Sequence, residues 1–253
     1  MRLFTIVFSP TGGTRKAASI IAGELSGDLT DINLMNADFK GKALSSEDLA
    51  LIAVPAFSGR VPTIAAERIS SLRGNGALAI LLSSFGNRAV DDTLIELRDL
   101  AKQAGFRPFA AIEAVTQHSL LPRYGAGRPD ARDRKDLKAF AAKIREKLLS
   151  GESLEGELEV PGNHPYRERR PSDIHPTSGK GCSSCLSCVF VCPVGAISME
   201  QPERTDPKRC IGCMACVSVC PQKTRKLREK DRKALEEHLK EACAGRSENR
   251  LYL

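Results

Sequence analysis

The chain has 253 residues, 42% of them hydrophobic and 27% charged, which is typical of folded globular proteins and excludes disordered and membrane-embedded classes. This length predicts one or two domains, each able to bury its own core. The net charge of +7 favours acidic protein partners, nucleic acid or anionic lipid alike, so it excludes little by itself.

The first nine residues are apolar but too short for a signal-peptide core, and a glycine turn follows without a small-residue cleavage pattern. No segment approaches the roughly 20 apolar residues of a membrane span. We therefore expect a cytoplasmic protein with no membrane span. In a reducing compartment the nine cysteines are expected to be metal ligands or redox groups rather than disulfides.

Residues 1–150 alternate short β-rich apolar runs with amphipathic stretches, which predicts parallel strands joined by crossover helices. The expected strands are Leu3–Phe8, Leu29–Leu34, Leu49–Val54, Ala77–Leu82 and Phe109–Val115. The expected helices are Thr14–Leu25, Pro62–Leu72, Asp91–Ala104 and Asp130–Leu149, whereas Asn36–Asp48 is indistinct. Such doubly wound sheets bind ligands at the carboxyl ends of their strands, so the loops after strands one, three and four are candidate sites.

Residues 151–178 are rich in proline and show little periodicity, which indicates a linker or wrapping segment between domains at 1–150 and 179–253. A helix is expected at Lys226–Ala244. Basic and acidic residues are mixed in 223–240, as on a solvated helix surface, so no nucleic-acid partner is expected.

A cysteine pattern, C-x2-C-x2-C-x3-C-P, occurs twice with an offset of 28 residues. Each run places three thiolates on a tight loop around a cubane, and its fourth cysteine ligates the other cluster. This crossed ligation assigns Cys182, Cys185, Cys188 and Cys220 to one 4Fe-4S cluster, and Cys210, Cys213, Cys216 and Cys192 to a second. Three cysteines at this spacing do not suit one tetrahedral zinc ion.

The repeat closely resembles bacterial dicluster ferredoxins over about 45 residues, including all eight ligands and both prolines. The resemblance implies a small α+β ferredoxin-like domain in which each cluster transfers one electron. Apolar residues between the ligands are expected to shield the clusters and to help set their potentials. Cys243 stands outside the repeat and is expected to be a buried, unreactive thiol rather than a redox group.

The first expected strand leads into Ser9-Pro10-Thr11-Gly12-Gly13-Thr14 and then a helix. Hydroxyl groups, backbone N–H groups and a helix N-terminus together favour phosphate binding. The loop has neither the Lys-Ser/Thr pair of a nucleotide P-loop nor the G-x-G-x-x-G of dinucleotide sites. From these residues alone, a glycine turn without a ligand remains an alternative.

The hexad matches the FMN phosphate loop of flavodoxins, S/T-x-T-G-x-T. Residues 55–62 and 83–89 resemble the ring-binding loops of a family that fuses a flavodoxin-like domain to a dicluster ferredoxin, and this resemblance covers nearly the whole chain, including 127–130 and 161–163. It implies a flavodoxin-like, doubly wound, five-stranded parallel sheet that binds FMN. The implied phosphate ligands are Ser9, Thr11, Gly12, Gly13 and Thr14, and the implied ring contacts are Ala56, Phe57, Ser58, Gly59, Arg60, Ser84, Phe85, Gly86, Asn87 and Arg88.

Two of these positions have more than one interpretation. Asn87 and Arg88 are expected to polarise a bound flavin, or equally to be a loop cap and a surface arginine. Phe57 and Phe85 stand where flavodoxins often have Tyr or Trp, and a phenyl face stacks without offering a polar edge. His118 and Tyr124 follow the fifth strand, and neither is assigned a catalytic role.

These features predict an electron-transfer protein that relays electrons between two 4Fe-4S clusters and FMN. Two alternatives stay open: a flavin-dependent reductase of a small substrate fed by the clusters, and a plain dicluster ferredoxin whose flavodoxin-like domain is an empty docking module. No catalytic constellation or NAD(P)H-binding domain is evident, so a redox protein partner is expected. The sequence gives neither its identity nor the oligomeric state.

Overall fold

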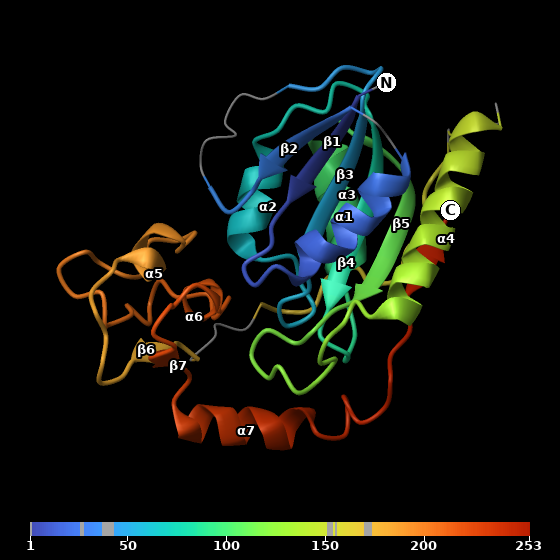
Figure 1. Ribbon diagram of the computed structural model, residues 1–253. Helices are drawn as coiled ribbons and strands as arrows, with labels where there is room; N and C mark the ends of the chain where they lie inside the picture. Colours follow the sequence, from blue (N-terminus) through green and yellow to red (C-terminus); the bar gives the residue numbers. More distant parts are fainter. Residues whose placement is uncertain (1, 26–27, 37–42, 151–153, 155, 170–173) are drawn as a thin grey trace.

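A computed structural model describes residues 2–25, 28–36, 43–150, 154, 156–169 and 174–253. Its main sheet has the strand order β2-β1-β3-β4-β5-β8 (Figure 1). The strands are β1 (Leu3–Val7), β2 (Leu29–Asn33), β3 (Leu49–Pro55), β4 (Leu78–Phe85), β5 (Arg107–Val115) and β8 (Arg250–Tyr252). The first five pair in parallel, and β8 pairs antiparallel with β5.

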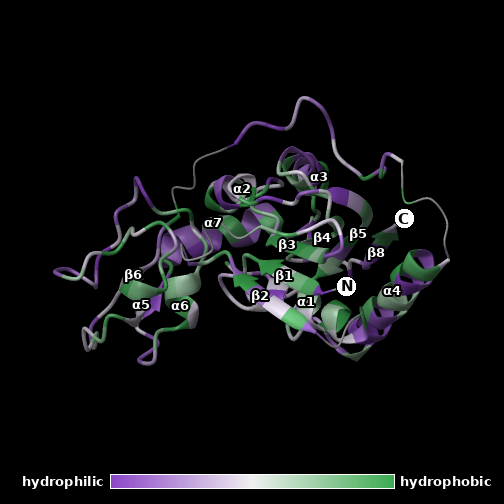
Figure 2. Ribbon diagram, turned by 90° about the horizontal axis from the view of Figure 1, so that it is seen from above, coloured by the Kyte–Doolittle hydropathy of each residue, from purple (hydrophilic) through white to green (hydrophobic). Residues whose placement is uncertain are grey.

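Helices cover both faces of this sheet because its strands are apolar on both sides. Along β3, Leu49, Leu51 and Ala53 pack on one face against α1 (Gly13–Leu25) and α4 (Ala131–Leu149). The residues between them pack on the other face, against α2 (Thr63–Ser70) and α3 (Thr93–Gln103). Hydrophobic strands therefore lie between helices whose outer surfaces are hydrophilic (Figure 2).

The predicted α/β class is confirmed. All five expected strands and four expected helices are present, with ends that differ by a few residues. The order 2-1-3-4-5 within the sheet is the flavodoxin-like order of doubly wound folds. Of the indistinct segment 36–48, residues 37–42 lie outside the described residues.

One strand was not expected. Residues 250–252 were placed in the second domain, but β8 joins the main sheet, where Tyr252 pairs with Ala111 and Arg250 with Glu113. A three-residue strand is too short to give a periodic signal in the sequence. The chain therefore returns to its first domain after passing through the cysteine repeat, and the division at 179 stays a prediction with this difference.

The segment 156–169 lies along α3, while the boundaries of the expected linker or wrapping segment at 151–178 stay a prediction. Leu158 is buried in the core on this face, and Asp92 accepts hydrogen bonds from the N–H groups of Asn163 and Arg167 at 3.0 and 2.7 Å. The guanidinium of Arg60 lies over the ring of Tyr166, 4.6 Å from its centroid. Residues 151–153, 155 and 170–173 lie outside the described residues.

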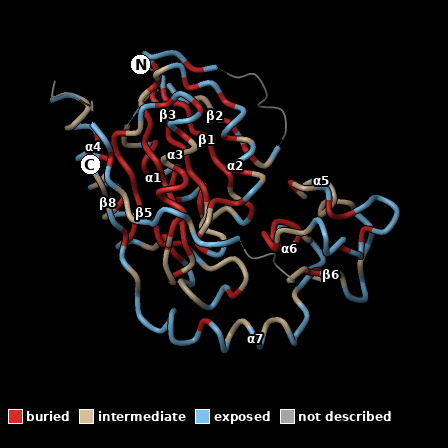
Figure 3. Tube along the Cα trace, turned by 180° about the vertical axis from the view of Figure 1, so that it is seen from behind, coloured by how far each residue is buried: buried red, intermediate tan, exposed pale blue. Residues whose placement is uncertain are grey.

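The cysteine repeat lies in residues 174–228, which we call the cluster module. Its elements are short: β6 (Thr177–Ser178), α5 (Ser187–Phe190), α6 (Ala215–Ser218) and β7 (Arg225–Lys226). Figure 3 shows that buried chain is sparse here and dense in the sheet. The helix expected at 226–244 is α7 (Glu229–Leu239), since Lys226 pairs in β7. No helix in the described part of the chain is long and apolar enough to cross a membrane.

Candidate cofactor sites

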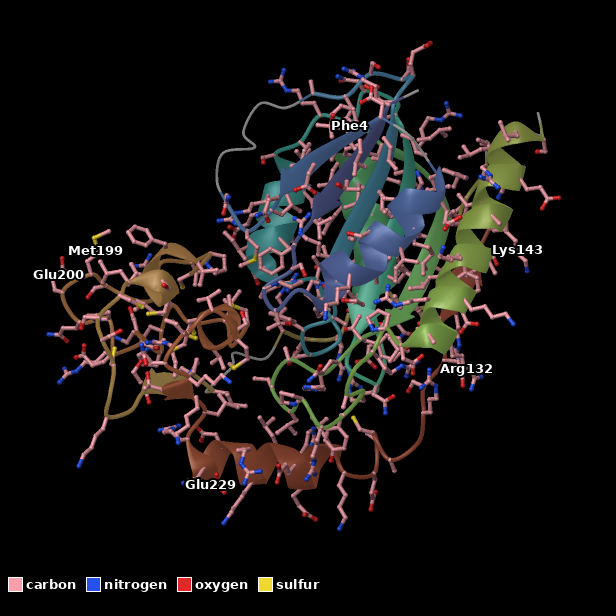
Figure 4. The ribbon with its side chains drawn as sticks, in the orientation of Figure 1. Phe4, Arg132, Lys143, Met199, Glu200 and Glu229 are labelled. Atoms are coloured by element: carbon pink, nitrogen blue, oxygen red, sulfur yellow. The ribbon has the colours of Figure 1, made fainter. Side chains whose placement is uncertain are left out.

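The eight repeat cysteines line two separate cavities. One, the first cluster site, is bordered by Cys182, Cys185, Cys188 and Cys220 and has a volume of about 320 Å³, including solvent at its mouth. The other, the second cluster site, is bordered by Cys192, Cys210, Cys213 and Cys216 and has a volume of about 310 Å³, again including solvent. The grouping is that of the two crossed ligand sets expected from the spacing, each combining three cysteines of one run with the last cysteine of the other, and ligation by these residues stays a prediction. Figure 4 shows sulfur atoms inside the module, with Met199 and Glu200 at its outer end.

This arrangement fits two cubanes. In the described part of the chain, no three His, Cys, Asp or Glu side chains come close enough together to hold a single metal ion. The thiols instead surround two cavities, which suits a cluster with a cysteine at each iron. The left-handed conformations of Leu186 and Met214, at φ 61° and 63°, start α5 and α6 in the same way and give the two loops one geometry.

The protonation of the thiols differs across the module. Burial raises the pKa of Cys213 to about 12. At Cys220 desolvation acts in the same direction, but N–H donors from Arg225 and Thr224 outweigh it and bring the pKa to about 7. Iron ligation requires thiolates, so binding at Cys213 must displace a firmly held proton.

A third and larger cavity opens at the carboxyl ends of the strands and encloses about 1,460 Å³, including solvent at its mouth. We call it the strand-end cavity. Ten of the implied FMN residues line it: Thr11, Gly13, Thr14, Ala56, Phe57, Ser58, Ser84, Phe85, Gly86 and Arg88. The loops after β1, β3 and β4 thus meet at one place, as doubly wound folds require.

The loop after β1 presents backbone donors to this cavity. Ser9 accepts the N–H of Arg15 through its Oγ at 3.0 Å, which satisfies one free donor of the first turn of α1. The hydroxyl groups of Thr14 and Ser84 lie 2.8 Å apart and join the first loop to the fourth strand. Gly12, at φ 85°, has a left-handed backbone that a residue with a side chain would strain. Thr11 and Gly13 are left facing the cavity with the helix N-terminus behind them, which suits an anionic group.

Five implied FMN residues do not line the cavity: Ser9, Gly12, Gly59, Arg60 and Asn87. Arg60 is held elsewhere, because Glu96 accepts from its Nε at 2.7 Å. Gly59 lies against Asp91, and a Cβ there would come within 2.3 Å of the carboxylate. Neighbouring residues in the same loops point in different directions, which the motif alone does not reveal.

Asn87 holds the C-terminal segment. It is buried, has φ 68°, and donates through Nδ2 to the carbonyl oxygens of Cys243 and Gly245 at 3.1 and 2.6 Å. Its Oδ1 accepts from the N–H of Ser247 at 3.2 Å. Asn87 was expected either to polarise a flavin or to cap a loop, and these contacts are those of a loop cap.

Several residues of the cavity were not expected. They come from the loop after β5, the wrapping segment, the cluster module and α7: Thr116, Gln117, Ser119, Leu120, Arg167, Glu168, Ile211, Gly212, Cys213, Leu235, His238 and Leu239. His118, which was expected to be able to approach the ring, also lines the cavity. A cavity assembled from four distant segments has no local sequence signal. Cys243, by contrast, is buried beside Leu121 and Leu239, and burial raises its pKa, as expected of an unreactive thiol.

His118 has a defined orientation in this wall. The N–H groups of Leu120 and Leu121 both donate to its Nδ1 at 3.2 Å, so the neutral ring carries its proton on Nε2. Burial, and then the charge of Arg88, lower the pKa of His118 to about 4. The ring is therefore neutral at pH 7.

The cluster module is attached directly to the rim of the strand-end cavity. Ile211 and Cys213 border both this cavity and the second cluster site. The hydroxyl of Ser218, on α6, donates to the carbonyl oxygen of Pro10 at 3.4 Å, and Arg68 of α2 donates to that of Pro193 at 2.9 Å. The second cluster site thus shares a wall with the strand-end cavity.

Residues 181–224 match the family model described as a 4Fe-4S dicluster domain. Similar solved structures include the Streptococcus pneumonia TIGR4 flavodoxin, 20% identical over 57% of this chain and 99% of that one, with a TM-score of 0.38. Flavodoxin 1 from Bacillus cereus is 15% identical over 57% of this chain and 97% of its own, with a TM-score of 0.39. No curated protein matches the chain.

General stress protein 14 from Treponema denticola, solved in complex with FMN, is 13% identical over 57% of this chain and 99% of its own, with a TM-score of 0.35. The strand order, and not these scores, carries the assignment of the first domain. The family match carries the assignment of the second domain. Together the two domains indicate a redox role for the protein. The chain is a fusion of a domain of flavodoxin topology with a 4Fe-4S dicluster domain.

Proposed function

We propose that the protein relays electrons between two 4Fe-4S clusters, held by the eight repeat cysteines, and an FMN held in the strand-end cavity. One observation carries this proposal: Ile211 and Cys213 border both that cavity and the second cluster site. A cofactor in the cavity would be separated from that site by the side chains of one short loop. The first cluster site would then be the one that exchanges electrons with external partners, since its ligand Cys185 is exposed.

The residues of the first loop fit a phosphate. Thr11 offers a hydroxyl, and Gly13 and Thr14, the first residues of α1, line the same cavity, where a helix has N–H groups without intrahelical partners. Arg88 and Arg167 add positive charge to the walls, although both also bind Asp91. The Cβ of a residue at position 13 would lie 3.2 Å from Thr116, so a glycine keeps this loop close to the strand ends.

The remaining walls fit a flat aromatic ring system. Phe57 and Ala56 come from the loop after β3, and Gly86 lets His118 approach, since a Cβ at position 86 would lie 2.5 Å from its ring. From α7, Leu235 and Leu239 add apolar side chains to the wall of the cavity. A flavin exchanges two electrons and releases them singly, while a 4Fe-4S cluster exchanges one.

The first experiment determines the cofactors. Anaerobically purified protein is expected to release FMN on denaturation, in a ratio of one to each polypeptide, and to contain iron for two clusters. Iron for two clusters with no flavin, in protein offered FMN during purification, would contradict the proposal and leave a plain dicluster ferredoxin.

The second experiment follows the electrons. When a one-electron donor is mixed rapidly with the holoprotein, cluster absorbance is expected to fall first and flavin absorbance to follow within the same molecule, at a rate that is independent of protein concentration. A flavin phase whose rate rises with protein concentration would show electron transfer between molecules and would contradict the proposed relay. Turnover of an added small substrate would favour the reductase alternative.

A further inference from the structure

The two cluster sites are related position by position. Because the cysteine runs have an offset of 28 residues, each residue around one site has a counterpart 28 positions away. The structure supports this correspondence, since Leu186 and Met214 occupy the same left-handed position before α5 and α6. Differences between paired residues therefore report differences in the environment of two otherwise equal ligand sets.

Polar side chains surround the sulfur atoms of the first cluster site. Three contacts reach three of its four ligands: Ser187 Oγ lies 3.5 Å from Cys185 Sγ, Thr224 Oγ1 lies 3.6 Å from Cys220 Sγ, and Arg225 Nη1 donates to Cys188 Sγ at 3.8 Å. Cys185 is also exposed. The first site is thus hydrogen-bonded and close to water.

The second cluster site lacks these groups. The counterparts of Ser187, Thr224 and Arg225 are Ala215, Ala196 and Ile197, all three buried. Backbone groups donate to two of its sulfur atoms, Ala196 N to Cys192 Sγ at 3.2 Å and Gly212 N to Cys210 Sγ at 3.5 Å, and from outside the site the side chain of Arg225 acts on Cys216. This site is therefore the drier and less polar of the two.

Arg225 is an unusual buried cation. Only 2% of it is exposed, and it donates to the carbonyl oxygens of Pro202 at 2.7 Å and Arg204 at 3.2 Å, while its Nε has no partner. Within the described ranges, no carboxylate forms an ion pair with it. A buried guanidinium without a counterion is costly. It lines the first site and donates to Cys188 Sγ there, whereas it acts on Cys216 without lining the second site, so its charge bears more directly on the first cluster. Anionic clusters would supply the missing negative charge.

We propose that Arg225, Ser187 and Thr224 hold the first cluster at a higher reduction potential than the second, so that electrons rest at the exposed site rather than beside the strand-end cavity. Reduction adds one electron, and so one negative charge, without making or breaking a bond. A nearby cation and hydrogen bonds to sulfur stabilise that charge, and exposure to solvent acts likewise. This inference deepens the relay proposed above but rests on the clusters alone.

The test is an anaerobic titration with dithionite, followed by electron paramagnetic resonance. The wild-type protein is expected to show two one-electron steps whose equilibrium constants differ at least tenfold, a separation of about 59 mV or more. Exchanging the small residues between sites gives matched variants. Ser187→Ala with Thr224→Ala should lower the higher step, and Ala196→Thr with Ala215→Ser should raise the lower step, so both narrow the separation.

Arg225→Ile introduces the residue found at the equivalent position of the second site, Ile197. It should give the largest shift, lowering the equilibrium constant of the higher reduction step at least tenfold. If Arg225→Ile loses iron, the double variant Ser187→Ala with Thr224→Ala provides the test, because those side chains are small and near the surface. Two clusters that are reduced together in the wild type, or a Ser187 and Thr224 pair that moves only the lower step, would overturn the proposal. Absence of FMN would change neither result.

Discussion

The main sheet and the cluster module are stabilised by different means. The sheet buries continuous rows of aliphatic side chains on both faces, whereas the longest helix within the module has four residues and its strands have two. Its buried apolar residues are few, among them Ala196, Ile197 and Met214. A segment with so little core depends on bound metal for its stability. One chain thus joins a fold that apolar packing stabilises to one that iron stabilises.

The largest expected effect is the loss of structure in the cluster module, with the main sheet unchanged. Cys213→Ala removes a ligand of the second cluster site and should cost about half the iron, with loss of ordered structure in the module. The matched control is Cys243→Ala, since this cysteine is also buried but ligates nothing. Iron content and circular dichroism are the measurements. Equal iron in both variants would contradict the ligand assignment.

The next effect concerns the joint between the two parts. Leu239 is 7% exposed, packs against Leu121 and covers the strand-end cavity. Leu239→Ala should destabilise the protein by about 2 kcal/mol, at the low end for a buried leucine because the site borders a cavity. Leu149→Ala is the control, since each leucine is the last residue of its helix and Leu149 is 79% exposed.

Urea unfolding of the two leucine variants provides the measurement. Leu149→Ala should lie within about 0.5 kcal/mol of the wild type. If Leu239→Ala were equally stable, α7 would not contribute to holding the module against the sheet. Flavin fluorescence that is unchanged in Leu239→Ala would likewise argue against its role as a cover.

The same difference in packing explains what the sequence could predict. Strands such as 49–55 are apolar on both faces and are bounded by turns, so their positions followed from periodicity. The spacing predicts which cysteines lie together around each cluster site, because cysteine chemistry constrains the geometry of each run. The roles of Asn87 and Arg60 could not be predicted from the sequence, since their hydrogen-bond partners lie more than 30 residues away along the chain. The cover of the cavity by α7 depends on tertiary contacts that no local pattern encodes.

The phosphate loop tests whether the strand-end cavity is an FMN site. Thr11→Asp places a negative charge where a phosphate is expected and should weaken FMN binding at least tenfold, or about 1.4 kcal/mol. Thr63→Asp is the control, because Thr63 is also exposed and also stands at a helix N-terminus, but outside the cavity. Titration of FMN into flavin-free protein gives both affinities. Equal affinities would place the phosphate elsewhere.

The smallest effect is a pH dependence that arises on the sheet side. Burial and Arg88 lower the pKa of His118 to about 4 in the folded protein, from an ordinary value of 6.5. Between these two values the unfolded chain binds a proton that the folded protein does not, so stability falls as the pH drops from about 6.5 to about 4. Above 6.5 this group has no effect. Water in the open cavity screens the ring, which leaves a contribution of about 1 kcal/mol.

His118→Asn isolates that contribution. The Oδ1 of asparagine can accept the N–H groups of Leu120 and Leu121, as Nδ1 of the histidine does, but the side chain does not titrate. Urea unfolding over a pH series should give both proteins the same change in free energy of unfolding from pH 8 down to about 6.5. Below about 6.5 the two curves should separate, with the variant losing less stability. Curves that stay parallel down to pH 4 would show that the ring is not desolvated, and the cavity wall would then be as wet as the exposed face of the cluster module.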